Sequence, residues 1–266
     1  MGFRGLGRKK KEKQLLIAAR DDGRDAYFKK APWKSAKAQL KKESFGKCAY
    51  CDAPTEAVAH GDVEHFRPKS SWWWLACCYD NYVFSCQICN QSFKGDKFPI
   101  LGVRAAEPVL PAGISDTQLE GLLGTFAPDP FEDPVPPNAG LTSAQFSKAC
   151  KSEKAVLINP YEEDPETMLA YEVLRSSHEV RVIPKLPKFE ARIDACDKFY
   201  GLNRETLCRE RWRSYEALEL VWDAWQAIGV DKRPLLRPTF KLAVEKDRPF
   251  AGMARYFVET VWGIAI

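Results

Sequence analysis

The chain has 266 residues, 45% of them hydrophobic, and carries 40 Lys or Arg against 36 Asp or Glu. This is enough apolar material for a sizeable core, in one large domain or two small ones. The 18 Pro and 16 Gly are spread along the chain, which excludes a collagen-like or broadly disordered protein. No apolar run of about 18 residues could cross a membrane, and the basic start lacks the apolar core of a signal peptide. We therefore expect a soluble, cytoplasmic protein.

Positive charge is concentrated at the beginning of the chain. Residues 1–47 hold fifteen Lys or Arg and five acids, a formal charge of +10, which leaves −6 for the remainder. A basic segment on a mildly acidic body is typical of a protein that binds phosphates at one end, and the stretch Arg8–Lys13 is the candidate for contact with DNA. A solvated helix face explains the same residues equally well on charge alone. Two helices are expected here, at about 12–20 and 33–43.

Two Cys-x-x-Cys pairs, Cys48/Cys51 and Cys86/Cys89, are the strongest local signal. Four thiolates from two tight turns suit a closed, tetrahedral structural zinc site. One such pair by itself could be a redox motif, but two pairs in one segment favour Zn²⁺. The other cysteines are expected to be buried small apolar residues, the usual state of a free cysteine: Cys77, Cys78, Cys150, Cys196 and Cys208.

The segment between the two pairs contains the parts of a hydrolytic site. His65 could take a proton from water, since a neutral imidazole is a base near physiological pH. Oxygen atoms of carboxylates and amides nearby could hold a hard divalent cation, Mg²⁺ or Mn²⁺. Basic side chains beside them could hold a phosphate backbone. The candidates for that contact are Arg67, Lys69, Lys94 and Lys97.

This segment resembles the HNH, or ββα-metal, endonucleases whose motif is framed by two Cys-x-x-Cys pairs. His65, Asn81 sixteen residues later and Asn90 nine further on match the three motif positions. The resemblance implies that His65 is the general base and that Asn81 holds the base-bearing loop. It implies that Glu64 and Asn90 ligate the catalytic Mg²⁺ or Mn²⁺. Asp62 is a rival ligand, because the family often has Asp where this chain has Glu64.

The run Glu64–Lys69 looks like the version in nuclease subunits of bacterial anti-phage systems of the Septu and retron-associated type. Three later segments look like the same group: 157–165, 200–203 and 249–255. The resemblance implies that the chain cleaves DNA and works beside a separate ATPase subunit. The chain has no phosphate-binding glycine loop of its own, consistent with that division of labour.

Beyond residue 103 the sequence predicts mostly helices. Short strands are expected at 157–160 and 180–183, and Asn203 is expected to cap a long helix. A last helix follows Pro249. Apolar residues at helical spacing indicate core positions in these two helices: Leu218, Val221, Trp222 and Trp225, and then Phe250, Met253 and Phe257.

We thus predict an α+β protein, a zinc-clasped HNH core embedded in a mainly helical chain. The expected regions are a basic helical arm at 1–47, the nuclease core at 48–103, an irregular insertion or linker at 104–150 and a helical region at 151–266. The rival hypothesis is a zinc-stabilised module that binds nucleic acid or protein without catalysis. Several bland roles are also open. Asn81 could cap a helix near Tyr82, His60 and His178 could be hairpin and surface residues, and Trp72–Trp74 are expected to pack in the core rather than stack on bases.

Overall fold

The computed structural model describes residues 2–3, 5–55, 61–128 and 141–266. Within these ranges the chain is α+β, as predicted, with many helices and two two-stranded sheets. The α-helices are α1 Gly5–Arg20, α2 Arg24–Lys29, α3 Lys37–Glu43, α4 Asp116–Glu120, α5 Ser143–Ser152, α6 Glu190–Tyr200, α7 Glu205–Ala227, α8 Arg237–Ala243 and α9 Ala251–Arg255. The strands are β1 Asp62–His65, β2 Tyr82–Ser85, β3 Leu169–Leu174 and β4 Glu179–Pro184. Short helical turns complete the set: η1 Pro32–Ala36, η2 Trp73–Leu75, η3 Tyr79–Asn81, η4 Ile88–Lys94, η5 Pro165–Thr167, η6 Pro187–Phe189, η7 Arg233–Leu235 and η8 Tyr256–Val261.

Contacts between residues divide the chain into two compact units. The first comprises residues 1–40, 62–84 and 95–156, and the second comprises 41–61, 85–94 and 157–266. Each unit therefore combines segments that are distant in the sequence. This grouping differs from the four regions expected above, whose boundaries stay predictions.

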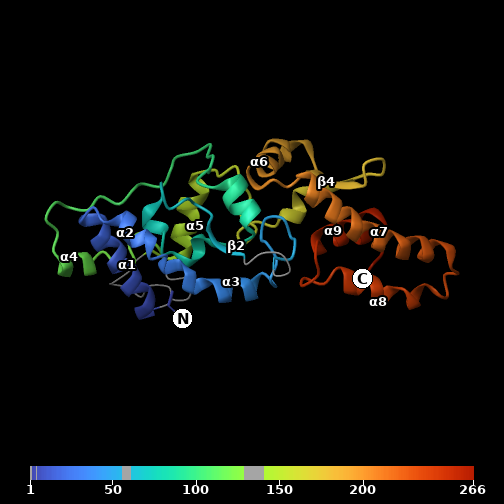
Figure 1. Cartoon of the computed structure of the whole chain (residues 1–266), viewed down its shortest axis with the longest axis horizontal. Coiled ribbons are helices and arrows are strands. Elements are labelled where there is room, and N and C mark those ends of the chain that lie inside the picture. Colours follow the sequence, from blue (N-terminus) through green and yellow to red (C-terminus); the bar gives the residue numbers. More distant parts are fainter. Residues whose placement is uncertain (1, 4, 56–60, 129–140) are drawn as a thin grey trace. The chain divides into compact units, whose positions relative to one another are not determined.

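The core of the first unit forms around α1. The helix ends at Arg20, and Asp22 then takes a left-handed conformation with φ of 54° before α2 begins at Arg24. α1 packs against α2 and α4 (Figure 1). Leu15 and Leu16 are buried in one cluster with Trp72–Trp74. The three tryptophans are therefore core residues, as predicted.

The sheet of the first unit pairs β1 with β2. η1 packs against β1, and β2 begins at Tyr82 directly after η3. Asn81 therefore ends a helical turn and precedes a strand. The alternative role of Asn81 as the cap of a helix starting near Tyr82 is wrong.

Helices also occur in the stretch for which the sequence predicts irregular structure. Ser115 and Gln118 form a capping box at the start of α4, and Thr142 and Gln145 form another at α5. In each box two backbone N–H groups of the first turn receive side-chain acceptors, which stabilises a short helix. Residues 129–140 of this stretch lie outside the described residues, as does His60.

The second unit combines the β3–β4 hairpin with a group of helices. The strands pair antiparallel, from Leu169 opposite Pro184 to Leu174 opposite Glu179. α7 packs on β4 and also against α8 (Figure 1). The predicted apolar face of α7 is confirmed, because Leu218 and Trp225 are buried and Val221 and Trp222 pack beside them. Phe250, Met253 and Phe257 are buried as well, as predicted for the last helix.

Two local predictions in the second unit are wrong. Residues 157–160 form no strand. A side chain takes the place of a neighbouring strand, because the Tyr200 hydroxyl donates to the Ile158 carbonyl at 3.1 Å. Asn203 does not cap α7, whose N-cap position is Arg204. The Asn203 side chain accepts from the Val182 N–H at 2.7 Å and donates to the Val182 carbonyl at 2.9 Å. It therefore extends the edge of β4, because an amide side chain can copy a backbone partner.

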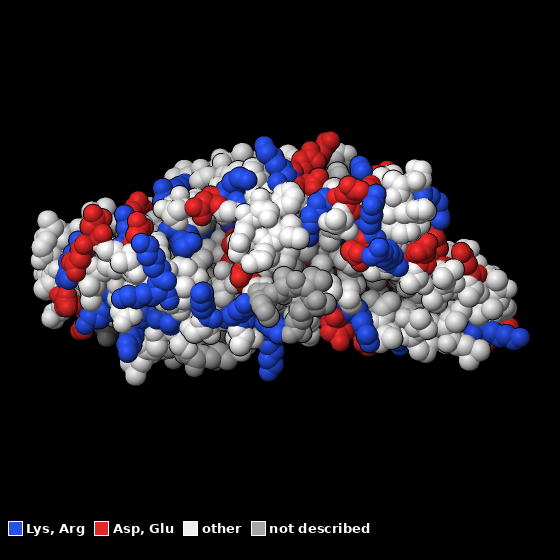
Figure 2. All heavy atoms as spheres, viewed as in Figure 1, with Lys and Arg blue, Asp and Glu red and all other residues white. Residues whose placement is uncertain are grey.

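Surface charge follows the sequence in part. Figure 2 shows Lys and Arg side chains over α1 and α3, where Lys9, Lys10 and Lys42 are exposed. Arg8 is instead buried, and its guanidinium pairs with the Glu12 carboxylate at 2.9 Å. No described helix combines the length and the apolar composition that a membrane crossing requires.

Candidate active site and metal centre

The four cysteines of the predicted zinc site converge in the second unit. Their sulfur atoms all lie within 4.8 Å of one another. The group consists of Cys48, Cys51, Cys86 and Cys89, of which only Cys86 is partly exposed. Four soft sulfur donors with no oxygen or nitrogen among them fit a closed tetrahedral Zn²⁺ site. The residues thus have the chemistry and the proximity to hold one zinc ion.

Local hydrogen bonds form both cysteine turns. The Cys48 N–H donates to the Ala53 carbonyl and the Asp52 N–H donates to the Cys48 carbonyl, both at 2.9 Å. Asp52 closes this turn with φ of 59°. In the second turn the Cys89 N–H donates to the Cys86 sulfur at 3.4 Å. These bonds place each pair of sulfurs on one side of its turn.

The other cysteines have a different environment. Burial raises the pKa of the Cys77 thiol to about 11 and that of Cys196 to about 12. Within the cluster the shifts differ in sign: a hydrogen bond from Cys48 lowers the pKa of Cys51 to about 7, whereas burial raises the pKa of Cys48. The thiolate is the form that binds metal. The five cysteines outside the cluster are buried, as predicted.

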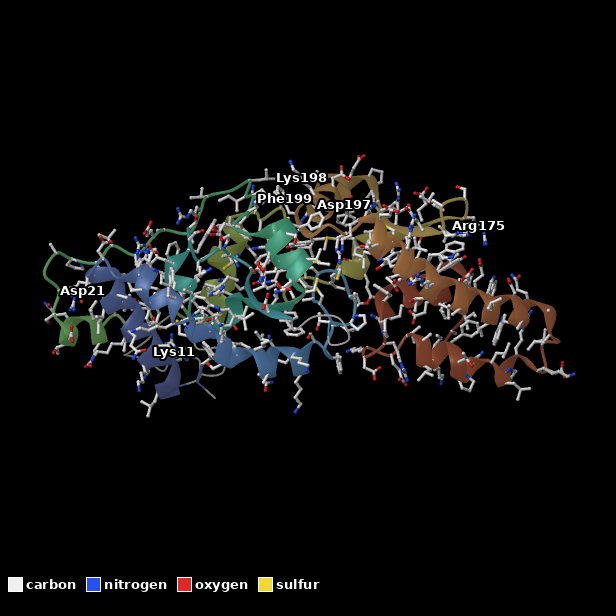
Figure 3. All side chains as sticks on the ribbon, viewed as in Figure 1. Lys11, Asp21, Arg175, Asp197, Lys198 and Phe199 are labelled. Carbon is white, nitrogen blue, oxygen red and sulfur yellow. The ribbon has the colours of Figure 1, made fainter. Side chains whose placement is uncertain are left out.

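The turn after α6, residues 200–203, supports this cluster. Tyr200 stacks on Tyr50, inside the first cysteine turn, with ring centroids 3.8 Å apart. Gly201 takes a left-handed conformation, and a Cβ added to it would lie 2.5 Å from the Phe93 ring. Asp197 on α6, labelled in Figure 3, accepts from the Asn203 N–H at 2.6 Å. Only glycine fits at 201, because the backbone there nearly touches an aromatic ring.

Arg204 follows this supporting turn and contacts the cluster directly. Sequence reasoning missed it. Its guanidinium donates to the Cys89 sulfur at 3.5 Å and to the Cys51 sulfur at 3.8 Å. No spacing marks an arginine more than 100 residues from its sulfur partners. The signal that could have found it is its place directly after the turn 200–203, which resembles the Septu-type proteins.

The start of α9 contacts the same cysteine turn. The Phe250 N–H donates to the Asp52 carbonyl at 3.1 Å, and the Gly252 N–H donates to the Asp52 carboxylate at 3.3 Å. Lys47 pairs with that carboxylate at 2.6 Å. All three late segments singled out in the sequence therefore contact the first cysteine turn or the supporting turn. Residues 200–203 do so through Tyr200, residues 249–255 through Gly252, and residues 157–165 through the bond of Ile158 with Tyr200.

In the first unit, His65 ends β1 and its ring is buried. Nε2 lies 3.1 Å from the Ala76 carbonyl oxygen. The rings of Trp33 and Tyr82 approach edge to face, with centroids 4.8 and 5.1 Å from the imidazole. A carbonyl oxygen only accepts, so this bond places the ring proton on Nε2 and makes Nδ1 the basic nitrogen of the neutral ring.

Asn81 fixes the chain just after His65. Its side-chain oxygen accepts from the Arg67 N–H at 2.8 Å, and its NH₂ group donates to the Arg67 carbonyl at 3.0 Å. Its own carbonyl accepts from the Phe66 N–H at 2.9 Å. The Asn81 side chain is fully buried, so these bonds are shielded from water.

The remaining site residues differ in burial. Glu64 is buried on β1 and Asp62 is partly exposed on the same strand. Asn90 lies on η4, which belongs to the second unit, and is partly exposed. Whether Glu64 or Asp62 joins Asn90 as a ligand stays a prediction.

The four basic candidates fall into two groups. Lys97 is exposed, and Lys69 is partly exposed with its ammonium 5.3 Å from the Trp33 ring centroid. Lys94 is buried, and so is Arg67. The Arg67 guanidinium pairs with the Glu153 carboxylate at 2.7 Å, with both side chains nearly inaccessible. This geometry favours Lys69 and Lys97 over the other two for contact with a phosphate.

Glu153 is a second residue that sequence reasoning missed. Besides Arg67, its carboxylate accepts from Trp72 Nε1 at 2.8 Å and from the Ala105 N–H at 3.0 Å. One buried acid therefore joins the exit of β1, the tryptophan segment and the chain after residue 103.

The comparisons with known proteins give one partial match. Over 79 residues the chain is 38% identical to the Septu protein PtuB of Bacillus mycoides. The match covers 25% of this chain and 27% of that protein. The chain thus spans about a quarter of that relative, and it is a partial homologue of a Septu protein. No protein-family model matches the chain, and no solved structure matches it.

Proposed function

We propose that this chain is a divalent-metal-dependent HNH endonuclease that hydrolyses DNA as the nuclease subunit of a Septu-type anti-phage defence system. The partial identity with a Septu protein supports the system. The match of Glu64, His65, Asn81 and Asn90 to the HNH motif supports the chemistry. The observation that carries the proposal is the setting of His65, whose tautomer is fixed by Ala76 and whose strand exit is clamped by Asn81.

In the proposed mechanism Nδ1 of His65 takes a proton from a water molecule, which attacks the phosphorus in line with the leaving oxygen. The Ala76 carbonyl stabilises the imidazolium that forms, since it keeps its hydrogen bond to Nε2. The ring needs no reorientation because its neighbours hold it. Glu64 and Asn90 would hold Mg²⁺ or Mn²⁺, which when bound supplies positive charge for the phosphate oxygens. Lys69 and Lys97 would hold the backbone.

A plasmid-nicking assay with Mg²⁺ or Mn²⁺ tests the base. His65→Ala should lower the cleavage rate by about 10²–10⁴-fold, the usual contribution of a general base. Zinc content should stay unchanged, since His65 belongs to the other unit. His178→Ala is the matched control, because His178 is exposed and lies in the second unit. Full activity of His65→Ala would end the HNH assignment.

The metal ligands are tested in the same assay. Glu64→Ala and Asn90→Ala should lose activity that a higher Mg²⁺ or Mn²⁺ concentration partly restores, because a ligand variant weakens binding rather than proton transfer. Asp62→Ala should keep most of its activity. The reverse result, an active Glu64→Ala and an inactive Asp62→Ala, would move the ligand to Asp62.

The proposed system includes a separate ATPase that controls the nuclease. The resemblance of residues 64–69 and of the three later segments supports this partner. Co-expression with the proposed ATPase and size-exclusion chromatography should give one peak that contains both chains. Two separate peaks at micromolar concentration, with strong cleavage by this chain alone, would show a free-standing nuclease instead.

A non-catalytic zinc-stabilised binding module remains the second candidate, and the burial of His65 at 6% exposure favours it. Such a module would bind nucleic acid with no dependence on Mg²⁺ or Mn²⁺. Isothermal titration of the zinc-loaded protein with Mn²⁺ separates the two. Binding that Asn90→Ala weakens supports the enzyme, and the absence of binding supports the module.

A further inference from the structure

Arg204 lies beside the cysteine cluster, which would be negatively charged with Zn²⁺ bound. Four thiolates around one Zn²⁺ leave a net charge of −2. The nearby Lys47 is paired with the Asp52 carboxylate at 2.6 Å and donates to the Arg248 carbonyl at 2.9 Å. Arg204 is the described cation whose donors reach the sulfurs, those of Cys89 and Cys51.

The backbone holds this guanidinium in place. Arg204 Nη1 also donates to the Gly201 carbonyl at 2.8 Å. Gly201 itself is fixed by its left-handed conformation and by its contact with Phe93. The two sulfurs that Arg204 reaches come from different cysteine turns, one from each Cys-x-x-Cys pair. The planar fork of arginine can serve two sulfurs and a carbonyl at once, whereas the single ammonium of lysine cannot.

We propose that Arg204 is a positioning residue of the zinc centre, which bridges the two cysteine turns and protects the Cys51 and Cys89 sulfurs from electrophiles. The positive charge and the hydrogen bonds withdraw electron density from both sulfurs, so they attack less readily as nucleophiles. The same charge favours the zinc-bound state, because the loaded cluster is anionic. The inference depends on zinc binding by the four cysteines and is independent of nuclease activity.

Zinc release during alkylation measures this protection. Iodoacetamide reacts with a zinc-bound sulfur; an S–C bond forms, the C–I bond breaks and iodide leaves. The alkylated sulfur no longer ligates, and the released zinc is read with a chromophoric chelator. Arg204→Gln should release zinc about tenfold faster or more, because the loss of a hydrogen-bond partner of a ligand typically weakens metal affinity by about 10–100-fold. Arg204→Lys should fall between this variant and the wild type.

Arg209→Gln is the matched control. Arg209 lies on the same helix, is exposed and pairs with Glu205 at 2.6 Å, so its loss removes one positive charge without touching a sulfur. It should release zinc at the wild-type rate. Equal rates for Arg204→Gln and the wild type would overturn the proposal.

Misfolding of Arg204→Gln can be separated from loss of protection. Circular dichroism and zinc content before alkylation identify folded, loaded protein. If Arg204→Gln does not fold, Arg204→Lys decides, since it keeps the charge and the aliphatic stem. Wild-type release from folded Arg204→Lys would then refute the bridging role, and faster release would support it. A wild-type protein without zinc would overturn the metal centre itself, whatever its cleavage activity.

Discussion

The two units hold their polar groups in opposite ways. Around His65 in the first unit, protein groups satisfy each other: Asn81 clamps the Arg67 backbone, and the Arg67 guanidinium pairs with Glu153. In the second unit four sulfurs lie close together, and Arg204 is the cation among the described residues whose donors reach them. In the first region protein groups supply both the donors and the acceptors of these bonds, whereas the four sulfurs of the second region have the chemistry to hold a Zn²⁺ ion.

The difference has a thermodynamic consequence. A buried ion pair forms with the fold, and breaking it leaves a charge away from water. A metal cluster stabilises the fold only while the ion is bound, because its binding energy is part of the folding energy. The folding stability of the second unit should therefore depend on bound zinc, and that of the first should not. Four predictions test this contrast.

The largest effect is expected from the loss of zinc. Cys48→Ser should remove most of the bound metal and destabilise the second unit by about 4 kcal/mol or more, the range in which metal loss falls. Zinc analysis and hydrogen exchange measure both, and exchange should rise in residues 157–266 more than in 62–84. Cys196→Ser is the control, because Cys196 is buried in the same unit outside the cluster. Full zinc content in Cys48→Ser would break the comparison.

A change at Glu153 should act on the first unit alone. Glu153→Ala removes the acceptor of Arg67, Trp72 and Ala105, so we expect a loss of about 3–5 kcal/mol. Glu153→Gln keeps a neutral acceptor and should lose less. Glu120→Ala is the control, since the exposed pair of Glu120 with Lys13 contributes little to stability. Denaturant unfolding gives the free energies. Zinc loss in Glu153→Ala would show that the two regions are not independent.

The same contrast explains what the sequence could predict. Metal ligands need fixed spacing within tight turns, so Cys48, Cys51, Cys86 and Cys89 could be read directly, and the cluster is confirmed. The apolar face of α7 was readable because helical periodicity determines it. The motif positions His65, Asn81 and Asn90 were read from resemblance, and their catalytic roles stay predictions.

Long-range polar pairs could not be read. Arg67 and Glu153 are 86 residues apart, and nothing local to either residue indicates its partner. The place of Arg67 between His65 and Lys69 predicts a phosphate contact, whereas the structure buries its side chain. Asn203 has the sequence position of a helix cap, yet tertiary contact with Val182 takes its side chain. Local propensity loses where a distant backbone group offers better hydrogen bonds.

A smaller effect is expected at Gly201, which lies in the supporting turn 200–203 beside the metal cluster. Gly201→Ala places a side chain at φ of 65° and against Phe93. We expect a loss of about 1–3 kcal/mol, of which about 1–2 is the left-handed backbone, and faster zinc release. Gly263→Ala is the control in the same unit, because its φ is also 65° with nothing within 4 Å of the added Cβ. Equal destabilisation in the two variants would mean that the Phe93 contact contributes nothing.

The smallest expected effect concerns the basic helix α1, and it shows which of its charges are available. Arg8 is buried with Glu12, and Lys13 pairs with Glu120, whereas Lys9 and Lys10 are exposed. If α1 contacts DNA, each exposed lysine that neutralises a phosphate releases about one counterion. The double variant Lys9→Gln/Lys10→Gln should thus reduce the slope of log affinity against log salt by about 2. Folding should not change, because neither side chain is in the core. The control double variant, Lys241→Gln/Lys246→Gln, removes two exposed lysines of the second unit. Fluorescence anisotropy with a short duplex at several salt concentrations measures the slopes. An equal reduction in both variants would mean that the net charge of the protein, rather than α1, sets the salt dependence.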